Sequence, residues 1–100
     1  MREFYPGDIV RHFKYDLYPD LVQSNPSIYT YEILYTNAIS ADDGKRIVVY
    51  QSLYEDTNLG IKLGQIYTRN YDDFTSVTDT AKYPEAKQKY RFEKIPEENT

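Results

Sequence analysis

The feature that most constrains this fold is a pair of apolar, aromatic runs on either side of a glycine turn. The run over residues 47–54, Ile-Val-Val-Tyr-Gln-Ser-Leu-Tyr, is the most apolar stretch of the chain. It follows closely on Asp43 and Gly44, and a second run over residues 28–35 precedes that turn. Strand-forming runs around an Asp-Gly pair predict a β-hairpin. We therefore expect this hairpin to form the centre of a small β domain.

Length and composition predict one domain without disulfide bonds. The 100 residues suit a single domain, which we place at residues 1–95, and residues 96–100 are expected to fray. Only 40% of the residues are hydrophobic, but twelve tyrosines and four phenylalanines supply large rings for a thin core. The absence of cysteine excludes disulfides, a thiolate nucleophile and cysteine-ligated zinc.

The charge balance makes nucleic acid a weaker candidate partner than protein. The formal net charge is −4 and the pI is about 4.9, whereas binding to phosphates needs clustered lysine and arginine. Basic residues are dense only from Lys82 to Lys94, where glutamates interleave with them. The chain begins with no apolar leader and contains no run of about eighteen apolar residues, so we expect a cytoplasmic protein with no membrane partner.

Alternating and apolar runs predict an all-β fold of five to six short strands with at most one short helix. Turn residues separate these runs at intervals of about eight to twelve residues, and this spacing is typical of antiparallel domains. Closure would remove the sheet edges, so we predict a small antiparallel barrel. A long loop over residues 15–26 is expected to carry one helical turn at residues 20–23. Residues 78–88 are expected to have a helical tendency, with Pro84 at a first-turn position. The expected strands cover residues 9–14, 28–36, 46–54, 60–66, 74–78 and 90–95.

Three blocks of sequence resemble a known family of small bacterial proteins. They are Val10–Lys14, Ile47–Tyr54 and Tyr90–Ile95, and in this order they resemble the domain-of-unknown-function family numbered 1653. The Arg-His-Phe-Lys and Val-Val-Tyr-Gln segments are the most specific parts. The resemblance implies a short, SH3-like β domain with no assigned activity. The chain departs from the family pattern at Tyr15, where a glycine is typical, and at residues 60–63, where a tryptophan and an Arg-Pro pair are typical.

Single residues on the predicted strands are candidates for binding. His12, the only histidine, could carry a proton or donate to a phosphate, or it could be structural. Gln51 is expected to face inward with Ile47 and Val49, where it would orient a ligand, fix Arg11, or satisfy strand backbone. An ion pair between Arg11 and a glutamate, at position 93 or 55, is expected to join the first strand to the last or to a turn.

The tyrosines of the predicted hairpin form a possible aromatic platform. Tyr50, Ser52 and Tyr54 share one strand face, and the partner strand would add Tyr29, Tyr31 and Tyr35. Such surfaces stack nucleic-acid bases or hold proline-rich peptides. Ordinary cross-strand packing and a dimer interface are the alternatives.

No catalytic motif stands out in the chain. The carboxylate pairs at residues 42–43, 55–56 and 72–73 lie in predicted turns and lack the spacing of a calcium loop. We therefore expect a binding module that is not an enzyme, with no cofactor and no metal site. A protein or peptide partner is favoured, with a small ligand or a homodimer as further possibilities and single-stranded nucleic acid as the alternative. The candidate ligand-binding residues are Arg11, His12, Tyr31, Tyr50, Gln51, Tyr54 and Lys62.

Overall fold

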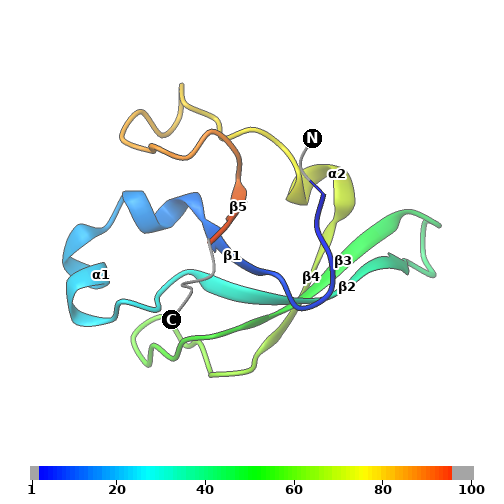
Figure 1. The fold of residues 1–100 in the computed structure, drawn as a ribbon, viewed down its shortest axis with the longest axis horizontal. Helices are drawn as coiled ribbons and strands as arrows, with labels where there is room; N and C mark the ends of the chain where they lie inside the picture. The colour runs from blue at the N-terminus through cyan, green and yellow to red at the C-terminus, as the bar shows by residue number, and fades with distance from the viewer. Residues whose placement is uncertain (1–2, 96–100) are drawn as a thin grey trace.

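A computed structural model describes residues 3–95, which form a mostly β fold around one antiparallel sheet (Figure 1). The strand order across the sheet is β4-β3-β2-β1-β5. The strands are β1 (Ile9–His12), β2 (Thr30–Ile39), β3 (Arg46–Ser52), β4 (Ile66–Asn70) and β5 (Phe92–Lys94). The helical elements are the 3-10 helix η1 (Phe13–Asp16) and the short helices α1 (Pro19–Ser24) and α2 (Tyr71–Phe74).

The described sheet is open. Strands β4 and β5 lie at its two edges and do not pair with each other, so the predicted closed barrel is not confirmed. The number of strands and their antiparallel pairing are confirmed, but the prediction of at most one short helix is wrong, because both α1 and α2 are present. The helical turn predicted at residues 20–23 is also confirmed, because α1 covers it.

The predicted hairpin is present, and its turn has the expected chemistry. Strands β2 and β3 pair from Tyr31 opposite Ser52 to Ile39 opposite Arg46. In the turn, Gly44 adopts a φ of 72°, which is costly for residues with a side chain. The register shifts on either side of Tyr35, and that side chain is 64% exposed. The prediction that Tyr35 belongs to the aromatic platform is therefore wrong, because the bulges separate it from the buried face.

Two strands predicted in the second half of the chain are wrong. Residues 60–65 are mostly turns rather than a strand: Ile61 forms a single bridge with Asp56, backbone hydrogen bonds join Gly64 and Gln65 to Ser52, and β4 begins only at Ile66. The strand expected over residues 74–78 is instead the end of α2 followed by a single bridge from Val77. Helix α2 begins at residue 71 because the side chain of Asn70 caps it by accepting two backbone N–H bonds. Residues 78–88, expected to have a helical tendency, are irregular and rich in turns.

One face of the sheet carries the core. Val10, Ile33 and Val48 are completely buried there, and the rings of Phe74 and Phe92 stack with centroids 4.1 Å apart and planes 7° apart. Figure 1 shows α2 and the segment that follows it lying over the same end of the sheet as β5. Because Val48, Tyr50 and Ser52 are the buried residues of β3, the core-facing set of this strand is the opposite of the set that includes Gln51.

A buried serine anchors the turn segment that precedes β4. Ser52 has no exposed surface, and its hydroxyl donates to the backbone oxygen of Lys62 at 2.6 Å and accepts from the backbone N–H of Gln65 at 3.1 Å. We expect Ser52→Ala to lower the free energy of unfolding by about 1–2 kcal/mol, because two hydrogen bonds are lost. Chemical denaturation would measure this change. Ser24→Ala is the control, since the Ser24 hydroxyl is exposed; an equal loss in both variants would contradict the anchoring role.

The first strand meets the last as predicted, but not through an ion pair of Arg11. Arg11 lies opposite Glu93 in the register of β1 and β5. The guanidinium instead lies 3.8 Å from the ring centroid of Tyr15, and the Glu93 carboxylate accepts from the backbone N–H of Tyr90.

The predicted frayed tail, residues 96–100, lies outside the described residues. Within residues 3–95, no helix has the length and apolarity needed to span a membrane.

Candidate functional site

The sheet face that carries the core also holds a cavity of about 210 Å³, which we call the tyrosine cavity. Four of the predicted site residues line it: His12 from β1, Tyr31 from β2, Tyr50 from β3, and Tyr54 just after β3. Cross-strand neighbours on one pleated face converge in this way because their side chains point to the same side of the sheet. The other lining residues are Lys14, Tyr29, Ile61, Tyr67, Arg69 and Phe92.

The end of β1 sets one wall of the cavity. His12 is the last residue of the strand and also the N-cap of η1, since its Nδ1 accepts the backbone N–H of Lys14 at 3.1 Å. This bond fixes the imidazole, which also stacks at 4.4 Å on Phe13 and meets the Phe92 ring edge-on at 4.9 Å. The same turn of η1 places Lys14 beside the cavity. A single local motif therefore positions both a ring nitrogen and a cation.

A strained backbone position contributes to the same wall. Tyr29 has a φ of 60°, the only positive value found for a non-glycine residue within 3–95. Bulky residues rarely adopt this conformation, and such strain concentrates at functional sites. The backbone oxygen of Tyr29 accepts from the His12 N–H at 2.9 Å, and its ring lies 5.9 Å from that of Tyr54. The surrounding contacts thus hold this tyrosine against the cavity.

The hydroxyls of Tyr31, Tyr54 and Tyr67 in the cavity lining are neutral at physiological pH. Those of Tyr31 and Tyr54 lie 3.2 Å apart and share a hydrogen bond. Burial raises the pKa of Tyr31 well above its usual value and raises the pKa of Tyr54 to about 12. Burial also raises the pKa of Tyr67. Each hydroxyl can therefore donate as well as accept.

Arg69 is held in place by partners on two sides. Its Nε donates to the Tyr50 hydroxyl at 3.3 Å, and its Nη1 lies 2.9 Å from the Asp73 carboxylate. Burial alone would lower the pKa of Arg69, but these bonds to Tyr50 and Asp73 raise it. Asp73 also pairs with Arg91 at 3.4 Å, so one carboxylate serves two guanidinium groups. The arrangement leaves a net positive charge beside the cavity.

Burial, together with nearby positive charge, keeps the imidazole of His12 neutral. Burial is the main cause, and the nearby charges of Arg69, Lys14 and Arg91 act in the same direction, against a smaller opposing effect of Asp73. Together they lower the pKa of His12 to about 3. Because Nδ1 is an acceptor, the neutral ring carries its proton on Nε2. Within residues 3–95 that nitrogen has no hydrogen-bond acceptor, which leaves a free donor on a ring that lines the cavity.

Three predicted site residues lie away from the tyrosine cavity. The side chain of Arg11 is on the opposite face of β1 from His12. Gln51 donates from its amide to the Glu32 carboxylate at 2.9 Å on the other face of β3, so the prediction that it faces inward is wrong. Lys62 is exposed, and its backbone oxygen accepts from the Ser52 hydroxyl and from the backbone N–H of Gln65.

The sequence reasoning missed the basic residues of the cavity. Arg69 and Tyr67 alternate with Thr68 in an Ile-Tyr-Thr-Arg-Asn segment, which is the pattern of a half-buried strand. This alternation indicates a strand, but Asn70 is typical of turns and favoured a turn for the segment. In the structure Asn70 is the last residue of β4 and the N-cap of α2. Lys14 carried no such signal, because its place depends on β1 ending at His12.

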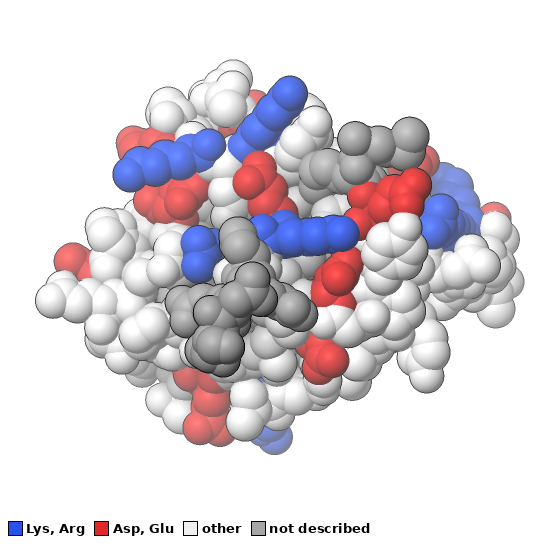
Figure 2. Space-filling view, viewed as in Figure 1, with Lys and Arg blue, Asp and Glu red and all other residues white. Residues whose placement is uncertain are grey.

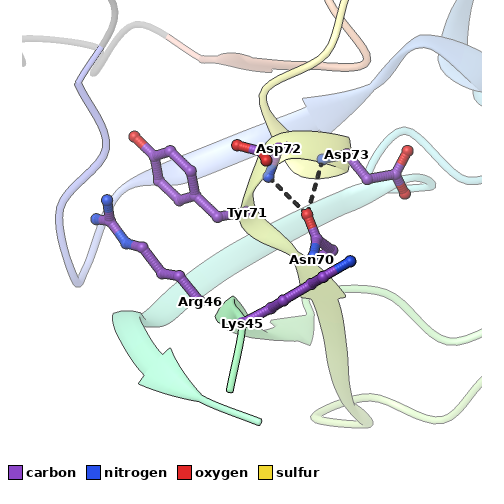
Figure 3. Close-up of a pocket in the computed structure, with 6 residues that line it drawn as sticks. All are labelled: Lys45, Arg46, Asn70, Tyr71, Asp72 and Asp73. Atoms are coloured by element: carbon purple, nitrogen blue, oxygen red, sulfur yellow. Dashed lines mark hydrogen bonds between the residues drawn. The ribbon is translucent and has the colours of Figure 1, made fainter. Parts of the chain in front are cut away.

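A larger hollow of about 790 Å³ lies beside α2 (Figure 3). Arg46 and Tyr71 point toward one another there, with the guanidinium 3.7 Å from the ring centroid. The Arg46 Nε donates to the backbone of Thr36, and the Asn70 oxygen accepts from two N–H groups of α2. Arg46, Tyr71 and Asn70 are thus engaged by partners within the protein, and we do not consider this hollow the better binding site. Lys45, Asp72 and Asp73 complete its lining.

No metal centre can be assembled from the part of the chain that the structure describes. Residues 3–95 contain no group of three or more histidine, cysteine, aspartate and glutamate side chains placed to hold an ion. The tyrosine cavity has one imidazole and no carboxylate in its lining.

Comparison with known proteins gives a family but no activity. The sequence matches a family model described as a protein of unknown function (DUF1653) over residues 8–94, which confirms the family resemblance. No curated protein and no solved structure matches the chain.

Proposed function

This chain belongs to the DUF1653 family, whose function is unknown, and we propose that it is a non-catalytic binding module whose ligand enters the tyrosine cavity. The observation that carries the proposal is the convergence of polar groups on one concave space lined by aromatic rings. Residues from β1, β2, β3 and β4, together with the turns between them, contribute to the cavity of about 210 Å³. Concave, mostly apolar sites with a few convergent polar groups are the usual form of a ligand site.

Several features support binding rather than catalysis. A general base needs a pKa near the working pH, whereas the pKa of His12 is lowered to about 3. The tyrosines with buried hydroxyls, Tyr31 and Tyr54, have raised pKa values and do not supply a phenolate at neutral pH. The lining contains no serine, threonine or carboxylate to act as a nucleophile. What remains are donors, cations and ring faces, which are binding groups.

Blocking the cavity tests the proposal. Ile61 is half-buried in the cavity lining, so Ile61→Trp would fill the space without altering the sheet. We expect wild-type protein to show amide NMR shifts at cavity residues with members of a set of single-ring compounds, short peptides and oligonucleotides. Ile61→Trp should abolish these shifts and remain folded. Leu63→Trp is the matched control, because Leu63 is 66% exposed and outside the lining. If no compound moves cavity residues in the wild type, the proposal is wrong.

Single-stranded nucleic acid is the second candidate for the ligand. Tyrosine rings beside Lys14 and Arg69 are the kind of groups that stack bases and contact phosphates. Figure 2 shows, however, that the lysines and arginines on the face in view are interspersed with acidic side chains rather than gathered in a stripe. Oligonucleotide binding that weakens steeply with added salt would support this candidate, and salt-insensitive or absent binding would rule it out.

A further inference from the structure

We propose that the tyrosine cavity selects a small planar anion, a single aromatic ring bearing a carboxylate or a similar acceptor-only group. This inference rests on the proposed binding function and adds the chemical class of the ligand. It follows from the charges, the free hydrogen-bonding groups and the size of the cavity.

The charged groups of the cavity lining are all cationic. Lys14 and Arg69 are its only charged side chains, and no carboxylate lines the cavity. Asp73, which lies next to Arg69, is shared between Arg69 and Arg91, so that cluster keeps one net positive charge. Lys14 is in no ion pair found within residues 3–95. An anionic ligand would therefore be attracted into a site that sits in an acidic protein.

The nitrogen groups that the cavity lining offers to a ligand are donors, and the tyrosine hydroxyls can both donate and accept. The Nε2–H of His12 has no acceptor within residues 3–95, and the ring is fixed by the bond from Lys14 to Nδ1. Ammonium and guanidinium groups can only donate. A carboxylate only accepts, so it complements this set, whereas an ammonium or amidinium group would leave the donors unpaired.

Size and shape restrict the ligand further. The volume of about 210 Å³ is below the roughly 300–1,000 Å³ of sites for drug-sized ligands, which favours one ring over a whole nucleotide. The tyrosine faces offer stacking surfaces for that ring. Aromatic cages also bind organic cations, but Lys14 and Arg69 would repel a cation at this site.

Three near-isosteric probes separate these possibilities: benzoate, benzamide and benzamidinium, which carry negative, zero and positive charge. We expect amide NMR titrations at moderate salt to give cavity shifts with benzoate and an affinity at least tenfold higher than for benzamidinium, with benzamide between them. Equal or tighter binding of benzamidinium would overturn the inference. Inorganic phosphate serves as a fourth probe: if it binds as tightly as benzoate, the ring is not recognised and the inference is also wrong.

Variants that remove one positive charge test which residues attract the anion. Lys14→Gln and Arg69→Gln should each weaken benzoate binding several-fold and change benzamide binding little. Lys62→Gln makes the same change in net charge at an exposed position outside the lining, and it should leave both affinities unchanged. Because Arg69 has structural partners, Lys14→Gln keeps the test decisive if Arg69→Gln does not fold. Equal losses in the Lys14 and Lys62 variants would show only a non-specific charge effect and contradict the inference.

The outcomes distinguish this inference from the proposed function. If neutral or cationic compounds shift cavity residues and benzoate does not, the binding function stands and the anion selectivity is wrong. If benzoate and every other compound leave the cavity residues unchanged, both are wrong.

Discussion

Replacing Phe74 with alanine is expected to lower the free energy of unfolding by about 3–5 kcal/mol, because the removal of a buried ring leaves a cavity as well as losing apolar burial. Phe74 has no exposed surface. Its ring stacks on Phe92 at 4.1 Å and meets Phe4 and Tyr50 at 5.4 Å each. Since small domains are stable by about 5–15 kcal/mol, this one change would remove a large share of the total.

Chemical denaturation followed by circular dichroism would measure the loss. Tyr35→Ala is the matched control: it also removes a ring from the chain, but one that is 64% exposed. We expect the control to change the free energy of unfolding by less than about 0.5 kcal/mol. Similar effects at the two positions would mean that the Phe74–Phe92 stack is not the centre of the core.

Lowering the pH from 7.5 to 5 is expected to remove about 2 kcal/mol of stability through His12 alone. The pKa of His12 is about 3 in the folded protein, against an ordinary value of 6.5. As the pH falls, the unfolded chain therefore takes up the proton first. The stability associated with the neutral His12 is fully present above pH 6.5, and it is lost progressively between pH 6.5 and about 3.

The difference between wild type and His12→Gln isolates this effect, since the carboxylates titrate in both proteins. Urea denaturation at a series of pH values should show a steeper fall in wild type, and the variant should lack the additional slope between pH 6.5 and 5. Parallel curves would contradict the burial of a neutral imidazole. Because His12 is the only histidine in the chain, no second imidazole obscures the comparison.

The tyrosine cavity connects these two predictions, since it lies between the core and solvent. Phe92 stacks on Phe74 on one side and lines the cavity on the other, where His12 meets it edge-on. Core packing therefore fixes the position of the candidate donor at His12. Such support from the core is what a preorganised binding site needs.

Part of the site could be predicted from the sequence because it lies on the predicted hairpin and the first strand. His12, Tyr31, Tyr50 and Tyr54 follow the period-two alternation of their strands, and the structure brings all four to one cavity. The same alternation led to the wrong prediction for Gln51. In residues 47–54 both faces of the strand are largely apolar, so alternation groups the side chains without telling which group is covered.

The sequence by itself determined the hairpin, its Gly44 turn and the supply of aromatic rings, because turn chemistry and alternation depend on near neighbours in the chain. Only the tertiary structure decided which face is buried and which charges meet there. The pairing of β4 with β3 brings Arg69 to the cavity that His12 also lines, and the ending of β1 at His12 brings in Lys14. These placements arise from contacts between segments that are distant in the sequence, and local sequence patterns do not predict such contacts.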